Sequence, residues 1–195
     1  MFEFYAKYLA TGQLKFKEGE IDLLRERMLF LPTNVLVKVQ QAVAKDKGEF
    51  YGIPLYSMFK EGGKAYAPAV RDQVGLNGGE IAKWMGTAST ASGWGSIKLV
   101  DYNNEKSRGI FEVVNSPFIQ HFPPPNPCCH IIRGLIAGTL ETLFGKGIDG
   151  IEKSCGVSTG SKCLMIFQPS EDWLNTNDPQ SKELMKHQLD LKALD

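Results

Sequence analysis

Four cysteines in the second half of the chain are the residues whose type and spacing best suggest chemistry. Cys129 falls where a helix is expected to begin, and a hairpin paired about Thr159 would place the sulfurs of Cys155 and Cys163 opposite each other. Glu152 lies beside them in the sequence. Three thiolates and one carboxylate make the number of ligands found in a closed tetrahedral zinc site. One interpretation of these residues is therefore a structural metal site.

The same residues allow two other interpretations. Cys155 and Cys163 could instead form a cross-strand disulfide. All four cysteines could also be buried thiols, since Cys often behaves as a small apolar residue. Spacing alone leaves these alternatives open. In the metal interpretation Cys128 is a spare thiol, and His130 is a possible substitute ligand.

The charge of such a site makes neighbouring cations important. Three thiolates and a carboxylate around Zn²⁺ leave a net charge of about −2. Arg133 follows Cys129 by one helical turn, and Lys153 and Lys162 flank the other ligands. We expect these three cations to offset part of the negative charge.

The strand that carries Glu152 cannot be regular. Glu152 and Cys155 are separated by an odd number of positions, so they would point to opposite faces of a regular strand. We therefore expect a turn or bulge at Gly150 or at Lys153-Ser154.

The apolar pattern predicts the elements that position these residues. Residues 131–144 carry an apolar stripe with a helical period, and Gly145 follows where a helix usually ends. Gly134 and Gly138 share one face of this helix, which would let another element approach closely. Residues 96–102 and 109–114 are predicted as a hairpin.

Helices are predicted before and after this region. Thr33 is the expected N-cap of a helix over residues 34–44, and further helical segments are predicted over 50–60, 65–75 and 80–85. Short strands are predicted within 13–31 and an extended connector over 116–127. Asp178 is expected to cap a last helix with Pro179 at its first position.

A family resemblance rests on these motifs. The chain reads Cys-His-x-x-Arg-Gly-x-x-Ala-Gly over 129–138, Glu-x-x-Cys over 152–155 and Gly-x-x-Cys over 160–163. This arrangement resembles the C-terminal half of the vinyl-4-reductase domain family. That family shares its fold with the sensor domains of phenol- and xylene-responsive transcription activators and with core subunits of the TRAPP vesicle-tethering complex. The clear match covers residues 94–167, with a looser match back to about residue 14.

The resemblance implies a fold, a domain organisation and a metal site. The implied fold is α+β, an antiparallel β-sheet with helices packed on one face, of the TRAPP-like ligand-binding type. Residues 1–168 would form a single ligand-binding domain with an N-terminal extension over 1–12, and residues 169–195 a helical tail. The aromatic-sensing members bind zinc with three cysteines and a glutamate, which correspond here to Cys129, Glu152, Cys155 and Cys163.

The function implied is that of a sensor-like protein that holds zinc and binds a small hydrophobic or aromatic ligand in an apolar pocket. Candidate pocket residues are Trp94, Phe111, Phe118 and His121. The alternatives are a homodimeric scaffold resembling the TRAPP subunits and a component of a vinyl-group reductase. No cofactor motif accompanies the reductase alternative, so an enzyme is the less favoured interpretation. A homodimer is expected by resemblance.

Composition bounds the remaining possibilities. The chain has 195 residues and a formal net charge of zero, so nucleic acid is not an expected partner. No apolar run approaches the roughly 20 residues that a membrane span requires. The N-terminal residues lack the pattern of a signal peptide. We therefore expect a cytoplasmic protein, where thiols stay reduced and a metal is favoured over a disulfide.

Overall fold

The computed structural model describes residues 2–122, 127–156 and 162–190. The predicted hairpin turn about Thr159 lies outside these residues. The elements are α1 (Phe2–Ala10), β1 (Leu14–Lys17), β2 (Glu20–Leu23), β3 (Glu26–Arg27), α2 (Thr33–Lys47), the 3-10 turn η1 (Gly48–Phe50), α3 (Gly52–Gly63), α4 (Tyr66–Val74), α5 (Gly79–Ala91), β4 (Ser96–Asn103), β5 (Arg108–Val114), the 3-10 turn η2 (Ile119–His121), α6 (His130–Phe144), β6 (Ile148–Ser154), β7 (Lys162–Pro169), α8 (Ser170–Leu174) and α9 (Pro179–Gln188).

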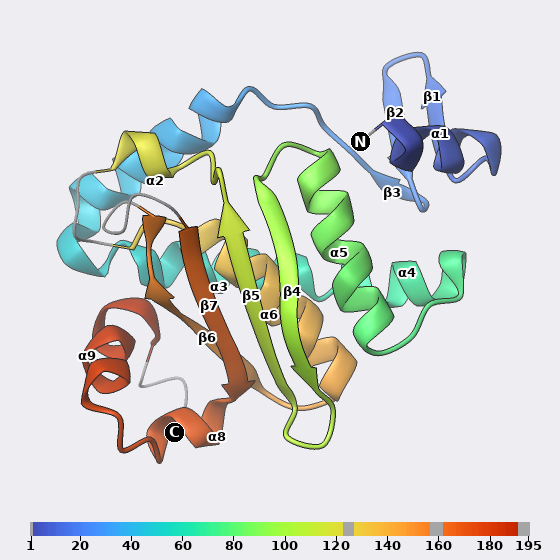
Figure 1. Cartoon of the computed structure of the whole chain (residues 1–195). Coiled ribbons are helices and arrows are strands. Elements are labelled where there is room, and N and C mark those ends of the chain that lie inside the picture. The colour runs from blue at the N-terminus through green and yellow to red at the C-terminus, as the bar shows by residue number, and fades with distance from the viewer. Residues whose placement is uncertain (1, 123–126, 157–161, 191–195) are drawn as a thin grey trace.

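A four-stranded antiparallel sheet in the order β4-β5-β7-β6 forms the centre of the molecule. Alternate residues of β5 and β7 are buried, as expected when one face of a sheet packs on a core. Figure 1 shows α6 and α3 lying behind this sheet. The predicted fold class, an antiparallel sheet with packed helices, is confirmed.

Helices α3 and α6 approach each other closely because α6 has glycines on the shared face. A Cβ atom on Gly134 or Gly138 would collide with the backbone carbonyl oxygens of Tyr56 and Lys60 in α3. The prediction that these two glycines admit a neighbouring element is confirmed. Helix α6 ends as predicted at Gly145, which adopts the left-handed conformation with φ of 67°.

The N-terminal residues form a small lobe of α1 and the three-stranded sheet β1-β2-β3 beside α5 (Figure 1). Tyr8 of α1 is buried, and its hydroxyl accepts a hydrogen bond from the indole of Trp84 in α5. Residues 29–31, which we call the strap, connect the lobe to α2 and have exposed side chains. The lobe therefore packs on the body through α1 while the strap spans the gap to α2.

Several local predictions differ from the structure. Thr33 is not an N-cap: α2 begins at Thr33, because the carbonyl oxygen of Pro32 already accepts a hydrogen bond from the amide of Val35. Helix α5 extends to Ala91, well past the predicted 80–85. The connector after β5 contains the turn η2 rather than being extended throughout. Asp178 caps α9 as predicted, accepting from the amide of Ser181 at 3.2 Å.

No helix among the described residues combines the length and the apolar character that crossing a membrane would require.

Candidate metal centre

Three cysteine sulfurs and one carboxylate meet in the interior. The ligand atoms of Cys129, Glu152, Cys155 and Cys163, which we call the donor cluster, all lie within 4.8 Å of one another. The Sγ atom of Cys163 is 3.6 Å from that of Cys129 and 3.9 Å from that of Cys155. A tetrahedral ion with bonds to sulfur of about 2.3 Å separates its sulfurs by about 3.8 Å. All four cysteines of the chain are thiols. The arrangement can therefore hold a metal ion.

Three consecutive elements bring the donor cluster together. Cys129 is the N-cap of α6, Cys155 directly follows β6, and Cys163 is the second residue of β7. Glu152 pairs with Met165, whereas Ser154 pairs with Leu164, so the register shifts by one residue at Lys153. The bulge predicted at Lys153-Ser154 is therefore confirmed. It turns Cys155 to the same side as Glu152.

Hydrogen-bonding groups surround the sulfurs. The Cys129 thiol donates to Oγ of Ser116 at 3.1 Å, and this hydroxyl can rotate to donate once the sulfur is a thiolate. The amide of Gly156 donates to Sγ of Cys163 at 3.2 Å. Partners of this kind orient metal ligands and stabilise their ionised form.

The carboxyl group of Glu152 is incompletely satisfied. Its side chain is fully buried, and Oε2 accepts a hydrogen bond from the amide of Cys129 at 3.1 Å. Oε1 is buried without a hydrogen-bond partner among the described residues. Burial raises the pKa of Glu152 to about 8, with the neighbouring thiol of Cys155 adding to the effect. A cation bound by the cluster would supply the missing partner of this oxygen.

The thiols of the cluster hold their protons in the absence of a cation. Hydrogen bonding to neighbouring thiols, together with burial, raises the pKa of Cys129 and of Cys163 well above the ordinary value. Metal ligation requires the thiolate, so an ion must displace these protons.

Of the three cations expected to offset the negative charge of the metal site, Arg133 agrees best with the expectation. Its side chain is fully buried, and its guanidinium donates to the carbonyl oxygens of Gly150 at 2.5 Å and Gln188 at 2.8 Å. The guanidinium also stacks 4.0 Å from the ring centroid of Tyr56. Burial lowers its pKa, and the phenol of Tyr56 opposes this fall most, followed by the acidic groups of Glu152, Asp149 and Cys129. Arg133 therefore lies within the electrostatic reach of the donor cluster.

The two lysines named with Arg133 are directed elsewhere. The ammonium of Lys153 pairs with Asp178 at the start of α9. The ammonium of Lys162 pairs with Glu112 on β5. Both ammonium groups therefore pair with carboxylates outside the donor cluster.

Cys128 and His130 flank the cluster rather than joining it. Cys128 is fully buried, and its Sγ lies 3.8 Å from that of Cys155. Nδ1 of His130 lies 3.3 Å from a guanidinium nitrogen of Arg133, and the ring meets Tyr51 edge to face. Burial lowers the pKa of His130 to about 3, which keeps the ring neutral. Neither residue belongs to the set of four mutually close donors.

The four candidate pocket residues do not all lie in one cavity. Trp94 and Phe118 line one cavity of about 290 Å³, and their ring centroids are 6.5 Å apart. Phe111 lies in the core of the sheet, packed edge to face against Phe167. His121 is exposed and borders a separate surface hollow. Two of the four candidates thus share a cavity.

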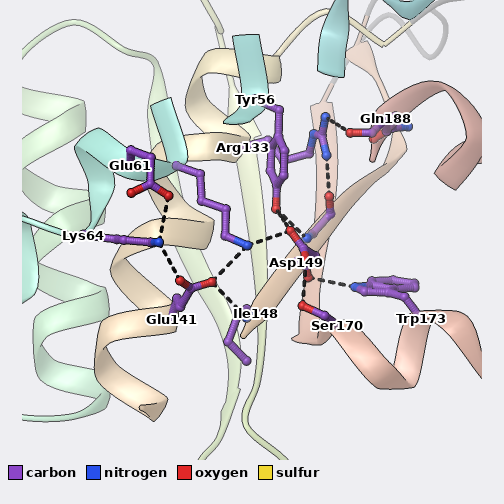
Figure 2. Close-up of polar contacts among 12 residues, drawn as sticks. Tyr56, Glu61, Lys64, Arg133, Glu141, Ile148, Asp149, Ser170, Trp173 and Gln188 are labelled. Carbon is purple, nitrogen blue, oxygen red and sulfur yellow. Dashed lines mark hydrogen bonds and ion pairs between the residues drawn. The ribbon is translucent and has the colours of Figure 1, made fainter. Parts of the chain in front are cut away.

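Several residues at these sites were not identified from the sequence. The cavity is completed by Tyr5, Tyr66 and the strap, which lie far from Trp94 in the sequence. No local pattern in the sequence links these residues to Trp94. Asp149 was also missed. It accepts from Tyr56 at 2.7 Å, Lys60 at 2.8 Å and Ser170 at 2.6 Å, and Figure 2 shows it at the centre of these contacts.

Comparisons with known proteins give one domain match and several structures of similar fold. Residues 110–169 match the vinyl-4-reductase domain, a span that contains the whole donor cluster. No curated protein matches the chain. The phenol-responsive sensory domain of the transcription activator PoxR, in a structure with phenol, has a TM-score of 0.74 and 19% identity, covering 91% of this chain and 92% of that chain.

Two further solved structures share the fold. A trafficking protein particle complex subunit 3 from Naegleria fowleri, covalently bound to palmitic acid, has a TM-score of 0.52 and 14% identity, covering 70% of this chain and 93% of that chain. A vinyl-4-reductase family protein from Methanocaldococcus jannaschii has a TM-score of 0.52 and 18% identity, covering 74% of this chain and 85% of that chain. The resemblance found in the sequence is thus confirmed: the chain carries a match to the vinyl-4-reductase domain over residues 110–169 and has the fold of the PoxR sensory domain.

Proposed function

We propose that this protein binds a small, uncharged hydrophobic or aromatic molecule in the cavity beside Trp94, and that its donor cluster holds a structural zinc ion. The cavity carries the proposal: it measures about 290 Å³, and every described side chain that lines it is neutral. Ligand sites are typically apolar hollows with a few polar groups. The fold likeness to the phenol-responsive domain of PoxR supports the same conclusion.

The polar groups of the cavity favour a neutral ligand. The hydroxyl of Tyr5 donates to the carbonyl oxygen of Ala91 at 3.2 Å and lies 3.4 Å from Oγ of Ser92. Burial raises the pKa of Tyr66, so its phenol stays protonated at neutral pH. These hydroxyls can exchange hydrogen bonds with a ligand hydroxyl or carbonyl. A charged ligand would be left unpaired, which costs several kcal/mol in a site of this kind.

The metal centre supports one wall of the cavity through Ser116. Oγ of Ser116 accepts from the Cys129 thiol at 3.1 Å, and the amide of Phe118 donates to the same oxygen at 3.4 Å. Phe118 in turn lines the cavity. When bound, zinc supplies a cross-link between α6, β6 and β7. It would thereby fix the segment that carries Phe118.

Zinc is the ion that the donors favour. Thiolate sulfur selects zinc over magnesium or calcium, and four protein ligands leave no open position for water. The unpartnered Oε1 of Glu152 is the observation in this structure that favours an ion at the site. In the reducing cytoplasm, where we place the protein, the thiols would be available for zinc.

Thermal unfolding with small aromatic probes tests the cavity. Phenol, 2-naphthol and toluene should raise the melting temperature, whereas benzoate should not, because no cation from the described part of the chain lines the cavity. A ligand at 100 times its Kd stabilises by about 2.7 kcal/mol, equivalent to about 5–10 °C for a chain of this size. Trp94→Ala should weaken this response. Phe50→Ala is the matched control, since Phe50 is a half-exposed aromatic residue outside the cavity.

Two results would contradict the binding proposal. One is the absence of any shift with all three neutral probes. The other is a shift of equal size in Trp94→Ala and in wild type, which would place the probe elsewhere.

Elemental analysis of protein purified without added metal tests the zinc site. We expect one zinc per chain in the wild type and in Cys128→Ser, and none in Cys155→Ser. Equal zinc loss in the two variants would overturn the assignment of ligands.

A second candidate function is assembly as a homodimer. The lobe and strap expose large apolar side chains, with Phe2 84%, Leu29 75% and Phe30 74% accessible. Exposed apolar groups that gather in one region often mark a contact surface. Light scattering after size exclusion would test this function: Phe30→Asp should convert a dimer to a monomer, and a monomeric wild type would exclude it.

A further inference from the structure

Helix α9 lies along the edge strand of the sheet. The strand order places β6 at one edge, so its outer backbone groups have no neighbouring strand among the described residues. At Glu152 the side chain of Gln188 takes the place of that strand. Oε1 of Gln188 accepts from the amide of Glu152 at 2.7 Å, and Nε2 donates to the carbonyl oxygen of Glu152 at 3.1 Å. Gln188 is fully buried, so water does not compete for these bonds.

Further contacts hold both ends of the same helix. The main-chain carbonyl oxygen of Gln188 accepts from the guanidinium of Arg133 at 2.8 Å, and Figure 2 shows Arg133 directed toward Gln188. At the other end of α9, Asp178 and Ser181 both contact the ammonium of Lys153. Both ends of α9 are thus bound at or beside Glu152, the residue whose carboxyl group enters the donor cluster.

We propose that Gln188 is a positioning residue for the metal ligand Glu152, and that the docking of α9 is coupled to metal binding. The inference rests on the metal site proposed above. The two hydrogen bonds hold the peptide units on both sides of the Glu152 Cα atom and so fix the direction in which its side chain leaves the backbone. That orientation directs the carboxyl group toward Cys129, whose amide donates a hydrogen bond to it. Loss of these two hydrogen bonds would let the backbone at Glu152 rotate. The carboxylate of Glu152 could then take up a wider range of positions.

Coupling of this kind acts in both directions. If docked α9 tightens metal binding by some factor, bound metal favours docked α9 by the same factor. Groups that orient metal ligands from outside the coordination sphere typically contribute 10–100-fold in metal affinity. The docking of the last turn of α9 would therefore depend on whether a metal ion is bound to the donor cluster.

Zinc affinity of the full-length chain, measured by competition with a chromophoric chelator, tests the positioning role. We expect Gln188→Ala to bind zinc 10–100-fold more weakly than the wild type. Lys186→Ala is the matched control and should stay within twofold of the wild type, because the exposed Lys186 pairs with Glu183 of the same helix and, among the described residues, holds α9 to no other element. Equal zinc affinity in Gln188→Ala and wild type would overturn the inference.

Hydrogen exchange of the wild-type chain tests the coupling without any variant. With zinc, the amides of α9 should exchange more slowly, by a factor comparable with the loss of affinity in Gln188→Ala. Exchange of α9 that is identical with and without zinc would overturn the coupling while leaving the metal site in place. A wild-type chain that takes up no zinc would instead refute the metal site, and the inference with it.

Discussion

Zinc binding to the donor cluster should release close to four protons per chain at pH 7. The thiols of Cys129 and Cys163 have raised pKa values and are protonated before the ion arrives. Cys155 contributes the third proton, because its thiol must lose a proton to bind the ion as a thiolate. Glu152 supplies the fourth. With a pKa of about 8, it carries about 0.9 proton at pH 7, whereas an ordinary carboxyl carries almost none.

Isothermal titration calorimetry in buffers of different ionisation enthalpy measures this number directly. The sign follows from the release of protons: zinc affinity rises with pH. At pH 7 the logarithm of the association constant should rise by about four for each pH unit. Above pH 8 the slope should fall toward three, because Glu152 then ionises before the ion binds. Cys128→Ser is the control, and the same number of protons should be released from it.

A release of three protons or fewer at pH 7, with no decline of the slope near pH 8, would refute this reasoning. It would mean that Glu152 is ionised in the metal-free protein or does not bind the ion. Release of four protons from the wild type but three from Cys128→Ser would identify Cys128 as a ligand.

Two further predictions concern the packing and charges that support the site. Gly138→Ala should lower the free energy of unfolding by about 3 kcal/mol or more, because the new methyl group would collide with the backbone of Lys60. Gly62→Ala is the control: Gly62 has open space around it, so this change should be neutral or should stabilise by up to about 1 kcal/mol. Urea unfolding measures both free energies. Although burial opposes it, hydrogen bonds from Lys64 and Lys60 lower the pKa of Glu141. The stability contributed by Glu141 should therefore be present above pH 4.5 and be lost as the pH falls below that value, and Glu141→Gln should remove this pH dependence in acid unfolding curves.

The donor cluster was predictable because its geometry is encoded locally. Cys129 lies at the start of a helix with a clear apolar stripe, and the odd separation of Glu152 and Cys155 required the bulge that the structure has at Lys153. The end of α6 was equally local, since Gly145 adopts the conformation that glycine favours at this position.

The supports of the site were not predictable, because they depend on long-range contacts between polar side chains. Gln188 contacts Glu152 across 36 positions of the sequence, and Asp149 is reached by Lys60 across 89. Neither contact leaves a periodic pattern. Helix α5 is a milder case. Its last residues are small and polar, yet Thr90 donates to the carbonyl oxygen of Gly86 at 2.7 Å and the buried Ala88 and Ala91 pack inside.

All four donors come from one continuous part of the chain, residues 129–163, and this bears on the order of folding. Closing a loop costs conformational entropy that grows slowly with its length, and the loops between these donors are short compared with the whole chain. Contacts of low sequence separation generally form early. The segment that contains α6, β6 and β7 therefore has the means to assemble as a nucleus and to capture an ion there. The N-terminal lobe, whose helix α1 packs against α5 of the body, would then dock onto a template that a bound ion would already hold in place.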